Sequence, residues 1–181
     1  MNASAPRSLL PLVLVGTAVL LAGCTVTVDG DGKSAGEGVS RRVGDDFFAA
    51  GDTVSLTEAV PGDAFVAGGD VYTAGEVGGD LAAAGGDVSI GGRIGGDVYA
   101  AGGNVRLDAI VDGGARVAGG DVTVGPATVI TGGTSLTGGK VDFEGEARDY
   151  LQAAGGRVRI GGVVKGDVEV RSDDLSIAPG T

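Results

Sequence analysis

The 181-residue chain contains no His and no Trp, and Cys24 is its only cysteine. Without His, the Ser-His and Cys-His nucleophile arrangements and all His-containing zinc sites are excluded. A single cysteine excludes a disulfide within the chain. Basic residues are also few, because 13 Lys and Arg stand against 24 Asp and Glu, for a formal net charge of −11. This charge repels nucleic acid, so we expect no nucleic-acid partner.

Glycine, in contrast, is abundant, with 38 residues. Collagen needs Gly at every third position, and the spacing here is irregular at that period. A flexible Gly-rich linker would be poor in apolar residues, whereas 43% of this chain is hydrophobic. The glycines therefore lie between the apolar segments of a folded core. The length of the chain suits one domain.

The N-terminus has the pattern of an export signal. Arg7 is the only charged side chain before a largely apolar run, 9–22. That run is shorter than the roughly 20 residues of a transmembrane helix. Residues 21–24, LAGC, resemble a bacterial lipobox. The resemblance implies that residues 1–23 are a lipoprotein signal peptide and that Cys24 is lipidated. It places the mature protein in the cell envelope, anchored to a membrane on its extracytoplasmic side. Ordinary signal cleavage and an uncleaved anchor are the alternatives.

Residues 24–44 follow as a polar, Gly-rich segment without a sustained apolar period. This composition is typical of a solvated, flexible linker. We therefore expect three parts, namely the signal peptide 1–23, the lipidated linker 24–44 and a repeat domain 45–181.

The repeat domain has a period of about 17 residues, within the range of solenoid repeats. Aligning its GGDV-like segments gives one apolar column, whose members recur at this period except for a single longer step near Pro126. The members are Val54, Val71, Val88, Val105, Val122, Val141, Val158 and Leu175. Further apolar columns keep the same register along the domain. Such a repeat is the signature of a solenoid.

Spacing within each repeat indicates strands. Val88 and Ile90 are two residues apart, as are Val98 and Ala100, so each pair points to one face of a strand. Glycines between the pairs would allow the tight or left-handed backbone that a corner requires. We predict an all-β fold, a single-stranded parallel β-helix of about eight coils with three short strands per coil. An antiparallel sandwich or barrel is the main alternative, although neither requires one constant register throughout.

The segment GDVYTAGEVGGDLAAAGGDVSIGGRIGGDVYAAGGNVRL resembles the repeats of bactofilins and related polymer-forming cytoskeletal proteins. The likeness covers about residues 47–181. It implies a right-handed β-helix and self-association end to end into filaments, often at a membrane and without a nucleotide. Those proteins mostly act in the cytoplasm, whereas the export signal here predicts a position in the envelope.

The two ends of such a rod carry residues that could cover open strand edges. Near the N-terminus, Phe47 and Phe48 are expected to lie over the core as a hydrophobic lid. Near the C-terminus the edge-protecting residues are Glu169, Arg171, Asp173, Asp174 and Pro179. A capped, monomeric rod is the alternative to self-association.

Acidic residues recur at the corners in two columns. One column contains Asp70, Asp87, Asn104, Asp121, Lys140, Arg157 and Asp174, and the other begins with Asp63, Asp80 and Asp97. Stacked carboxylates could bind a hard cation such as calcium. They could equally hydrogen-bond the backbone of each turn, and the amide and the bases in the first column favour this structural role.

Catalysis is not expected, and neither is a cofactor. Some β-helices are polysaccharide lyases or hydrolases, and Asp80 or Asp97 beside Arg93 suggests such a site. However, nearly every repeat has the same length, which leaves no long loops to build a cleft. We therefore expect a non-enzymatic, lipid-anchored, self-assembling envelope protein. The alternative is a monomeric acidic rod that binds divalent cations, glycan or an envelope protein.

Overall fold

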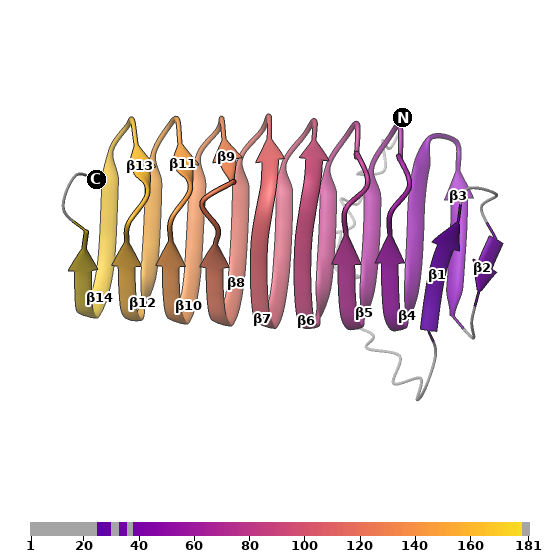
Figure 1. Ribbon diagram of the computed structural model, residues 1–181, viewed down its shortest axis with the longest axis horizontal. Coiled ribbons are helices and arrows are strands. Elements are labelled where there is room, and N and C mark those ends of the chain that lie inside the picture. The colour runs from indigo at the N-terminus through magenta and orange to yellow at the C-terminus, as the bar shows by residue number, and fades with distance from the viewer. Residues whose placement is uncertain (1–24, 30–32, 36–37, 179–181) are drawn as a thin grey trace, which may run out of the picture.

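The computed structural model describes residues 25–29, 33–35 and 38–178, and these form a parallel β-solenoid of about eight turns (Figure 1). No helix is present among the described residues. The predicted fold class is thereby confirmed. The signal peptide 1–23 and Cys24 lie outside the described residues.

Within the described ranges, fourteen strands make up a single sheet that winds around the core. They are β1 (Thr25–Asp29), β2 (Lys33–Ala35), β3 (Val39–Val43), β4 (Asp46–Leu56), β5 (Ala64–Thr73), β6 (Leu81–Ile94), β7 (Val98–Val111), β8 (Ala115–Val124), β9 (Val129–Ile130), β10 (Thr134–Phe143), β11 (Glu146–Ala147), β12 (Leu151–Ile160), β13 (Val163–Val164) and β14 (Val168–Ile177).

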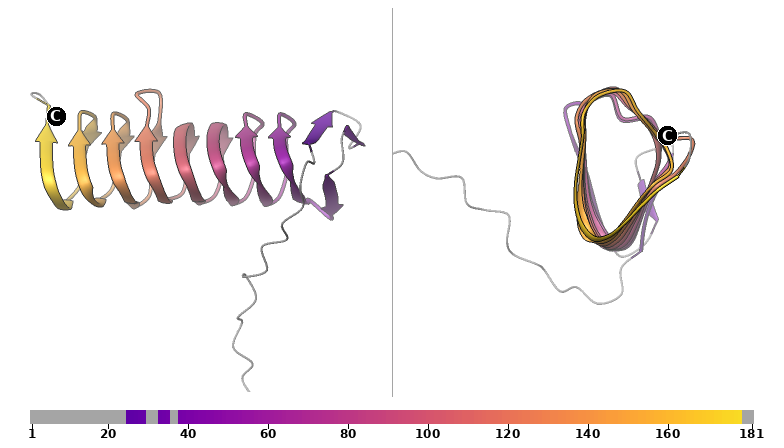
Figure 2. Two further views of the ribbon diagram at one scale, coloured as in Figure 1. Left: turned by 90° about the horizontal axis from the view of Figure 1, so that it is seen from below. Right: turned by 90° about the vertical axis from the view of Figure 1, so that its left-hand side faces the viewer.

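Each long strand pairs in parallel with its counterpart in the next coil, so equivalent residues lie above one another. Val71 pairs with Val88, and Val88 pairs with Val105. Viewed along the axis, the coils superimpose into one closed outline (Figure 2). The register is strongly specified, because a slip of one residue would turn every buried side chain outward.

Within a coil, the first two of the three expected short strands are joined. β5 runs without a break through Gly68 and Gly69, and its apolar residues are buried at alternate positions on both sides of this corner. The third side is only a two-residue strand or a single bridge such as Val60 with Val77, except in β6 and β7, where the strand continues onto it. The chain bends at the glycines while its ladder of hydrogen bonds continues.

Most corner glycines are needed for space rather than for a left-handed backbone. Among the described residues, positive φ occurs only at Gly44 and Gly92, with φ 83° at Gly92. At Gly102, by contrast, an added Cβ would lie 2.9 Å from the carbonyl oxygen of Gly85 in the coil below. Of the two expected reasons for corner glycines, a left-handed backbone applies at Gly92, whereas at most other positions close backbone approach excludes a side chain.

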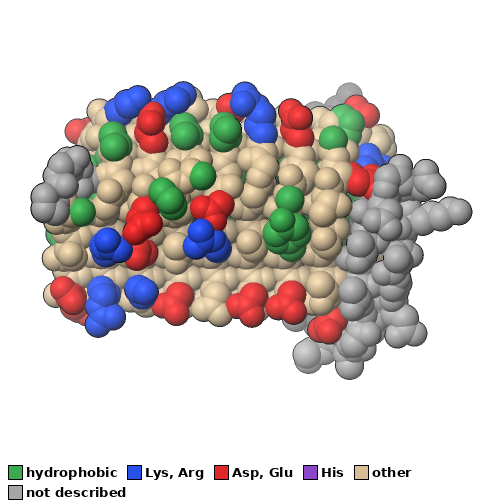
Figure 3. All heavy atoms as spheres, in the orientation of Figure 1, with side chains coloured by type: hydrophobic (Ala, Val, Ile, Leu, Met, Phe, Trp, Pro, Cys, Tyr) green, Lys and Arg blue, Asp and Glu red, His purple; other side chains and the backbone are tan. Residues whose placement is uncertain are grey.

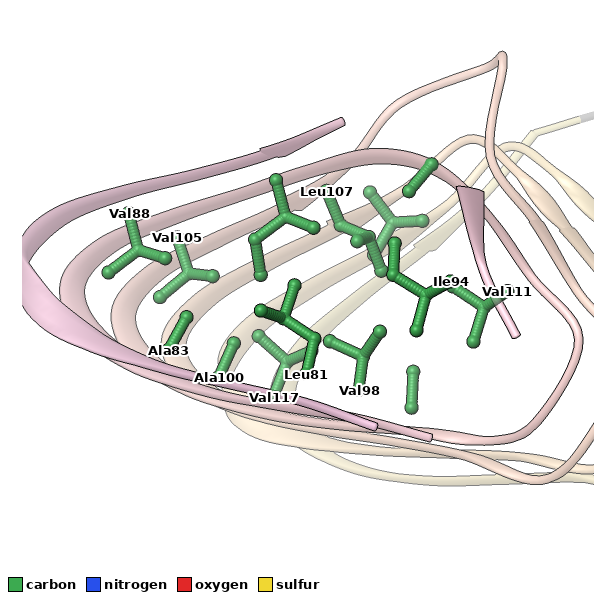
Figure 4. Close-up of a cluster of buried hydrophobic side chains, with 14 of the residues drawn as sticks. Leu81, Ala83, Val88, Ile94, Val98, Ala100, Val105, Leu107, Val111 and Val117 are labelled. Atoms are coloured by element: carbon green, nitrogen blue, oxygen red, sulfur yellow. The ribbon is translucent and has the colours of Figure 1, made fainter. Parts of the chain in front are cut away.

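The core is a narrow apolar column enclosed by the coils (Figure 4). Val88 and Val105 point inward opposite Ala83 and Ala100, and all four are nearly inaccessible to solvent. Burial of apolar surface is the main stabilising contribution in such a fold. Because every coil adds the same layer, the core extends along the rod instead of growing wider.

The one longer repeat is accommodated as a local bulge around Pro126. Thr128 turns back into the interior, where its hydroxyl donates a hydrogen bond to the carbonyl oxygen of Leu107 at 2.7 Å. The parallel register then resumes, since Ile130 pairs with Val111. One coil accordingly projects beyond its neighbours (Figure 2).

The segment expected to be a solvated linker contributes paired backbone to the N-terminal end. β1 pairs in parallel with the second half of β4, and β3 pairs antiparallel with its first half. The edge of β4 offers unpaired peptide groups, and these two strands satisfy them. Polar composition alone gave no sign of this pairing.

Two interior threonines leave polar atoms without a partner. The hydroxyls of Thr73 and Thr134 are buried and make no hydrogen bond within the described structure. We expect Thr73→Val to raise the free energy of unfolding by about 1 kcal/mol, because Val has nearly the same shape without the buried hydroxyl. Chemical denaturation would measure the change. Thr137→Val, at an exposed position, is the control, and a less stable Thr73→Val protein would contradict the prediction.

Candidate functional site

The column of Asp63, Asp80 and Asp97 is a hydrogen-bonding ladder at one corner of the rod. The carboxylate oxygen Oδ1 of each residue accepts the backbone N–H of the equivalent residue one coil later. The N–O distances are 2.8 Å for Asp63 with Asp80, 2.8 Å for Asp80 with Asp97, and 2.7 Å for Asp97 with Gly114. This geometry supports the structural interpretation of the column, because the carboxylates satisfy corner peptide groups that no strand partner reaches.

This ladder predicts a stability effect at an exposed residue. Asp80→Ala is expected to lower the free energy of unfolding by about 1–2 kcal/mol, because the Asp97 amide loses a charged acceptor. Asp87→Ala is the matched control, since Asp87 accepts only an exposed side-chain hydrogen bond from Asn104. Urea unfolding of both variants would test the prediction, and equal stability of the two would contradict it.

The second column, which contains Asp70, Asp87 and Asp121, lies on the outer surface of the long strands. Acidic and basic side chains form rows along the rod (Figure 3). In this column the Asn104 amide donates to Asp87 at 2.6 Å, and Arg157 forms an ion pair with Asp174 at 3.4 Å. Residues 25–29, 33–35 and 38–178 contain no group of three or more acidic side chains placed to hold a metal ion. Both the Asn104–Asp87 hydrogen bond and the Arg157–Asp174 ion pair join side chains of neighbouring coils.

The carboxylates considered for catalysis are not brought together with Arg93. Arg93 forms its ion pair with Asp112 at 2.6 Å. The Oδ1 atoms of Asp80 and Asp97 are held in the corner ladder, and Oδ2 of Asp97 accepts a hydrogen bond from the Tyr99 hydroxyl. These carboxylates therefore have structural partners.

A small ionic cluster lies on the third side of the later coils. Glu146 is 2.8 Å from Nζ of Lys165 and 2.9 Å from Nε of Arg148. Hydrogen bonds from Lys165 and then Arg148 lower the pKa of the Glu146 carboxyl, because both favour its ionised form. The cluster is exposed, so salt screens it.

The C-terminal coil is the surface where the structure leaves the core uncovered. Leu175 is 47% exposed, whereas Val158, which occupies the same column one coil earlier, is 0% exposed. Ile177 is 59% exposed against 2% for Ile160. Among the described residues, β14 pairs only with β12, so it presents one free strand edge. Apolar side chains and an unpaired edge occur together at this end.

The N-terminal end is covered differently from what the sequence suggested. Phe47 is buried in the first coil, while Phe48 points outward and stacks on Phe65. The expected pair of lid residues is therefore wrong, because adjacent residues of a strand face opposite sides. Arg42 of β3 lies over the Phe47 ring at 5.7 Å and forms an ion pair with Glu58 at 3.4 Å. A cation and an antiparallel strand thus close this end.

Comparison with protein-family models, curated proteins and solved structures finds no match for the chain. In the part of the chain that the structure describes, no helix is long and apolar enough to cross a membrane.

Proposed function

We propose that the protein is a non-enzymatic, lipid-anchored structural component of the cell envelope that self-associates through its C-terminal coil. The observation that carries the proposal is the uncovered core at β14. Cys24 supplies the anchor in this proposal, and the resemblance of residues 47–181 to bactofilin repeats supports end-to-end association. The regular coils of the described region make a stiff spacer suited to such a role.

The chemistry of the C-terminal coil favours a second copy as its partner. Val168, Leu175 and Ile177 continue the interior columns and are each about half exposed. Another β-helical end would bury them and pair the free edge of β14. Since β1 and β3 already pair with the edge of β4, the described part of the chain has one open end. We therefore expect two copies to meet at their C-terminal coils before any longer assembly forms.

Charge substitutions on adjacent residues of β14 test this proposal. In Leu175→Asp, a carboxylate replaces an apolar side chain of the contact, and we expect the dimer to dissociate at least about tenfold more readily. In Ser176→Asp, the matched control, the charge points away from the core, and association is expected to persist. Sedimentation of residues 25–181 over a range of concentrations measures both. A wild-type chain that stays monomeric throughout would refute self-association.

The second candidate is a monomeric acidic rod that serves as a binding module for divalent cations, glycan or another envelope protein. It is favoured by the charged side chains along β14, where Glu169 pairs with Arg171 at 2.6 Å and Asp174 pairs with Arg157. Charged residues on an edge strand oppose edge-to-edge pairing. The same sedimentation experiment separates the candidates, because the module predicts one mass at every concentration.

A further inference from the structure

One outer side of the rod carries a ladder of aromatic side chains along its N-terminal coils. Phe48, Phe65, Ala82, Tyr99 and Arg116 occupy equivalent positions in five successive coils, as their strand pairing shows. Phe48, Phe65 and Tyr99 are 40–41% exposed. Together with the neighbouring column of alanines, these residues line a groove of about 620 Å³.

The rings of this ladder stand with their faces along the rod axis. The Phe48 and Phe65 rings are parallel, with centroids 4.9 Å apart and 5° between their planes. This distance matches the spacing between coils of about 4.8 Å. At the far end, the guanidinium of Arg116 lies over the Tyr99 ring at 5.4 Å. The opposite face of Tyr99 is therefore turned toward the coil of Ala82.

At Ala82 one ring is missing from the ladder, between Phe65 and Tyr99. Two coil spacings separate the positions of Phe65 and Tyr99, which is about 10 Å. Between them the methyl group of Ala82 fills only the base of the gap. A flat ring placed midway would lie about 5 Å from both faces, within the range of favourable aromatic pairs. We call this gap the Ala82 slot.

The groups around the slot select an uncharged ring. Its floor is formed by alanines such as Ala84 and Ala101. Two arginines line the groove: Arg116 is already over the far face of Tyr99 and donates to its hydroxyl at 3.2 Å, and Arg41 pairs with Phe48 at the other end of the ladder. Asp97 accepts from the same hydroxyl at 3.2 Å, and Asp80, two residues before Ala82, holds its Oδ1 against the backbone N–H of Asp97. A sugar would leave its hydroxyls without partners on such a floor, whereas an aromatic ring has none to satisfy.

We propose that the Ala82 slot is a binding site for one flat, uncharged aromatic ring of a small molecule, held between Phe65 and Tyr99. The site is separate from the C-terminal coil, because the ladder belongs to β4–β8 and the coil to β14. Loss of ring binding at the Ala82 slot therefore does not entail loss of self-association at the C-terminal coil.

The test uses the full chain in nonionic detergent, with 2-naphthalenemethanol as the flat probe and cyclohexylmethanol as the puckered control. NMR of isotope-labelled Phe and Tyr rings reports the contact. We expect saturable ring-current shifts at Phe65 and Tyr99 with the naphthalene probe only. Absence of saturable shifts at these two rings, or equal shifts with both probes, would overturn the proposal.

A substitution that fills the slot provides the decisive comparison. Ala82→Phe supplies the missing ring from the chain itself, so probe binding is expected to weaken about tenfold or more, since both stacking faces are lost. Gln152→Phe adds a ring at the equivalent position four coils away and should leave binding unchanged. Thermal unfolding checks that both variants fold.

Two results would refute this assignment. Undiminished probe binding in folded Ala82→Phe would place the probe elsewhere. If Ala82→Phe instead lowered the oligomeric state of the protein without the probe, the occupant would be a ring from a second copy.

Discussion

Replacing Val105 by Asp is expected to unfold the rod. Val105 lies at the centre of the interior column, 2% exposed, between Val88 and Val122 in the coils on either side. The described structure offers no cation inside the core to pair with a carboxylate there. Burying an unpaired charge costs several kcal/mol, so we expect a loss of about 4 kcal/mol or more, a large part of the stability of a domain this size.

Ala101→Asp is the matched control for Val105→Asp. Both residues belong to β7, but Ala101 is exposed on the outer surface. Its carboxylate stays in water, and the thermal transition should shift little. Circular dichroism during heating would show the difference. A Val105→Asp protein that melts like the wild type would mean that this side chain does not face a packed interior.

The second large effect is expected at Cys24. In the proposed lipoprotein, the Cys24 thiol carries the diacylglycerol that holds the chain at the membrane. Cys24→Ser removes that attachment point, and no other cysteine can replace it. Stable anchoring requires the free energy of two or more buried acyl chains, at about 0.8 kcal/mol for each methylene. We expect metabolic labelling with palmitate to disappear and the protein to leave the membrane fraction.

Thr25→Ser is the control for this substitution, because it changes the neighbouring residue while keeping the thiol. Labelling and fractionation of this variant should match the wild type. If Cys24→Ser retained its palmitate label, the lipobox interpretation would be wrong. If it lost the label but stayed with the membrane, an uncleaved hydrophobic segment would have to hold it there.

Several features of the candidate surfaces could not be read from the sequence. The outward positions of Phe48, Phe65 and Tyr99 follow from strand alternation, yet the parallel stacking of Phe48 on Phe65 depends on side-chain rotamers. The gap at Ala82 can be recognised as a site only once the orientations of the Phe65 and Tyr99 rings are known. Likewise, the carboxylate of Asp80 reaches a backbone amide because the corner peptide of the next coil turns toward it.

The pairing of β1 and β3 with β4 shows why composition misled at the N-terminus. Residues 25–28, TVTV, alternate polar and apolar side chains over only four positions, and residues 29–43 have no such period. Their pairing is set by the backbone edge of β4, and peptide groups carry no residue-specific signal. At β14 the opposite holds. Its sequence continues the repeat, yet one of its edges is unpaired because no further coil follows among the described residues.

By itself, the sequence determined the solenoid, its register and the inward set of side chains. A column such as Val71, Val88 and Val105 recurs at one constant interval, and only stacked coils can bury all of its members together. The tertiary structure alone decided how each corner is satisfied, which end is closed and where the aromatic ladder is interrupted. The physical reason is that burial follows from a repeating apolar pattern, whereas hydrogen bonds, ring stacking and edge pairing depend on orientations that arise only when separate coils meet.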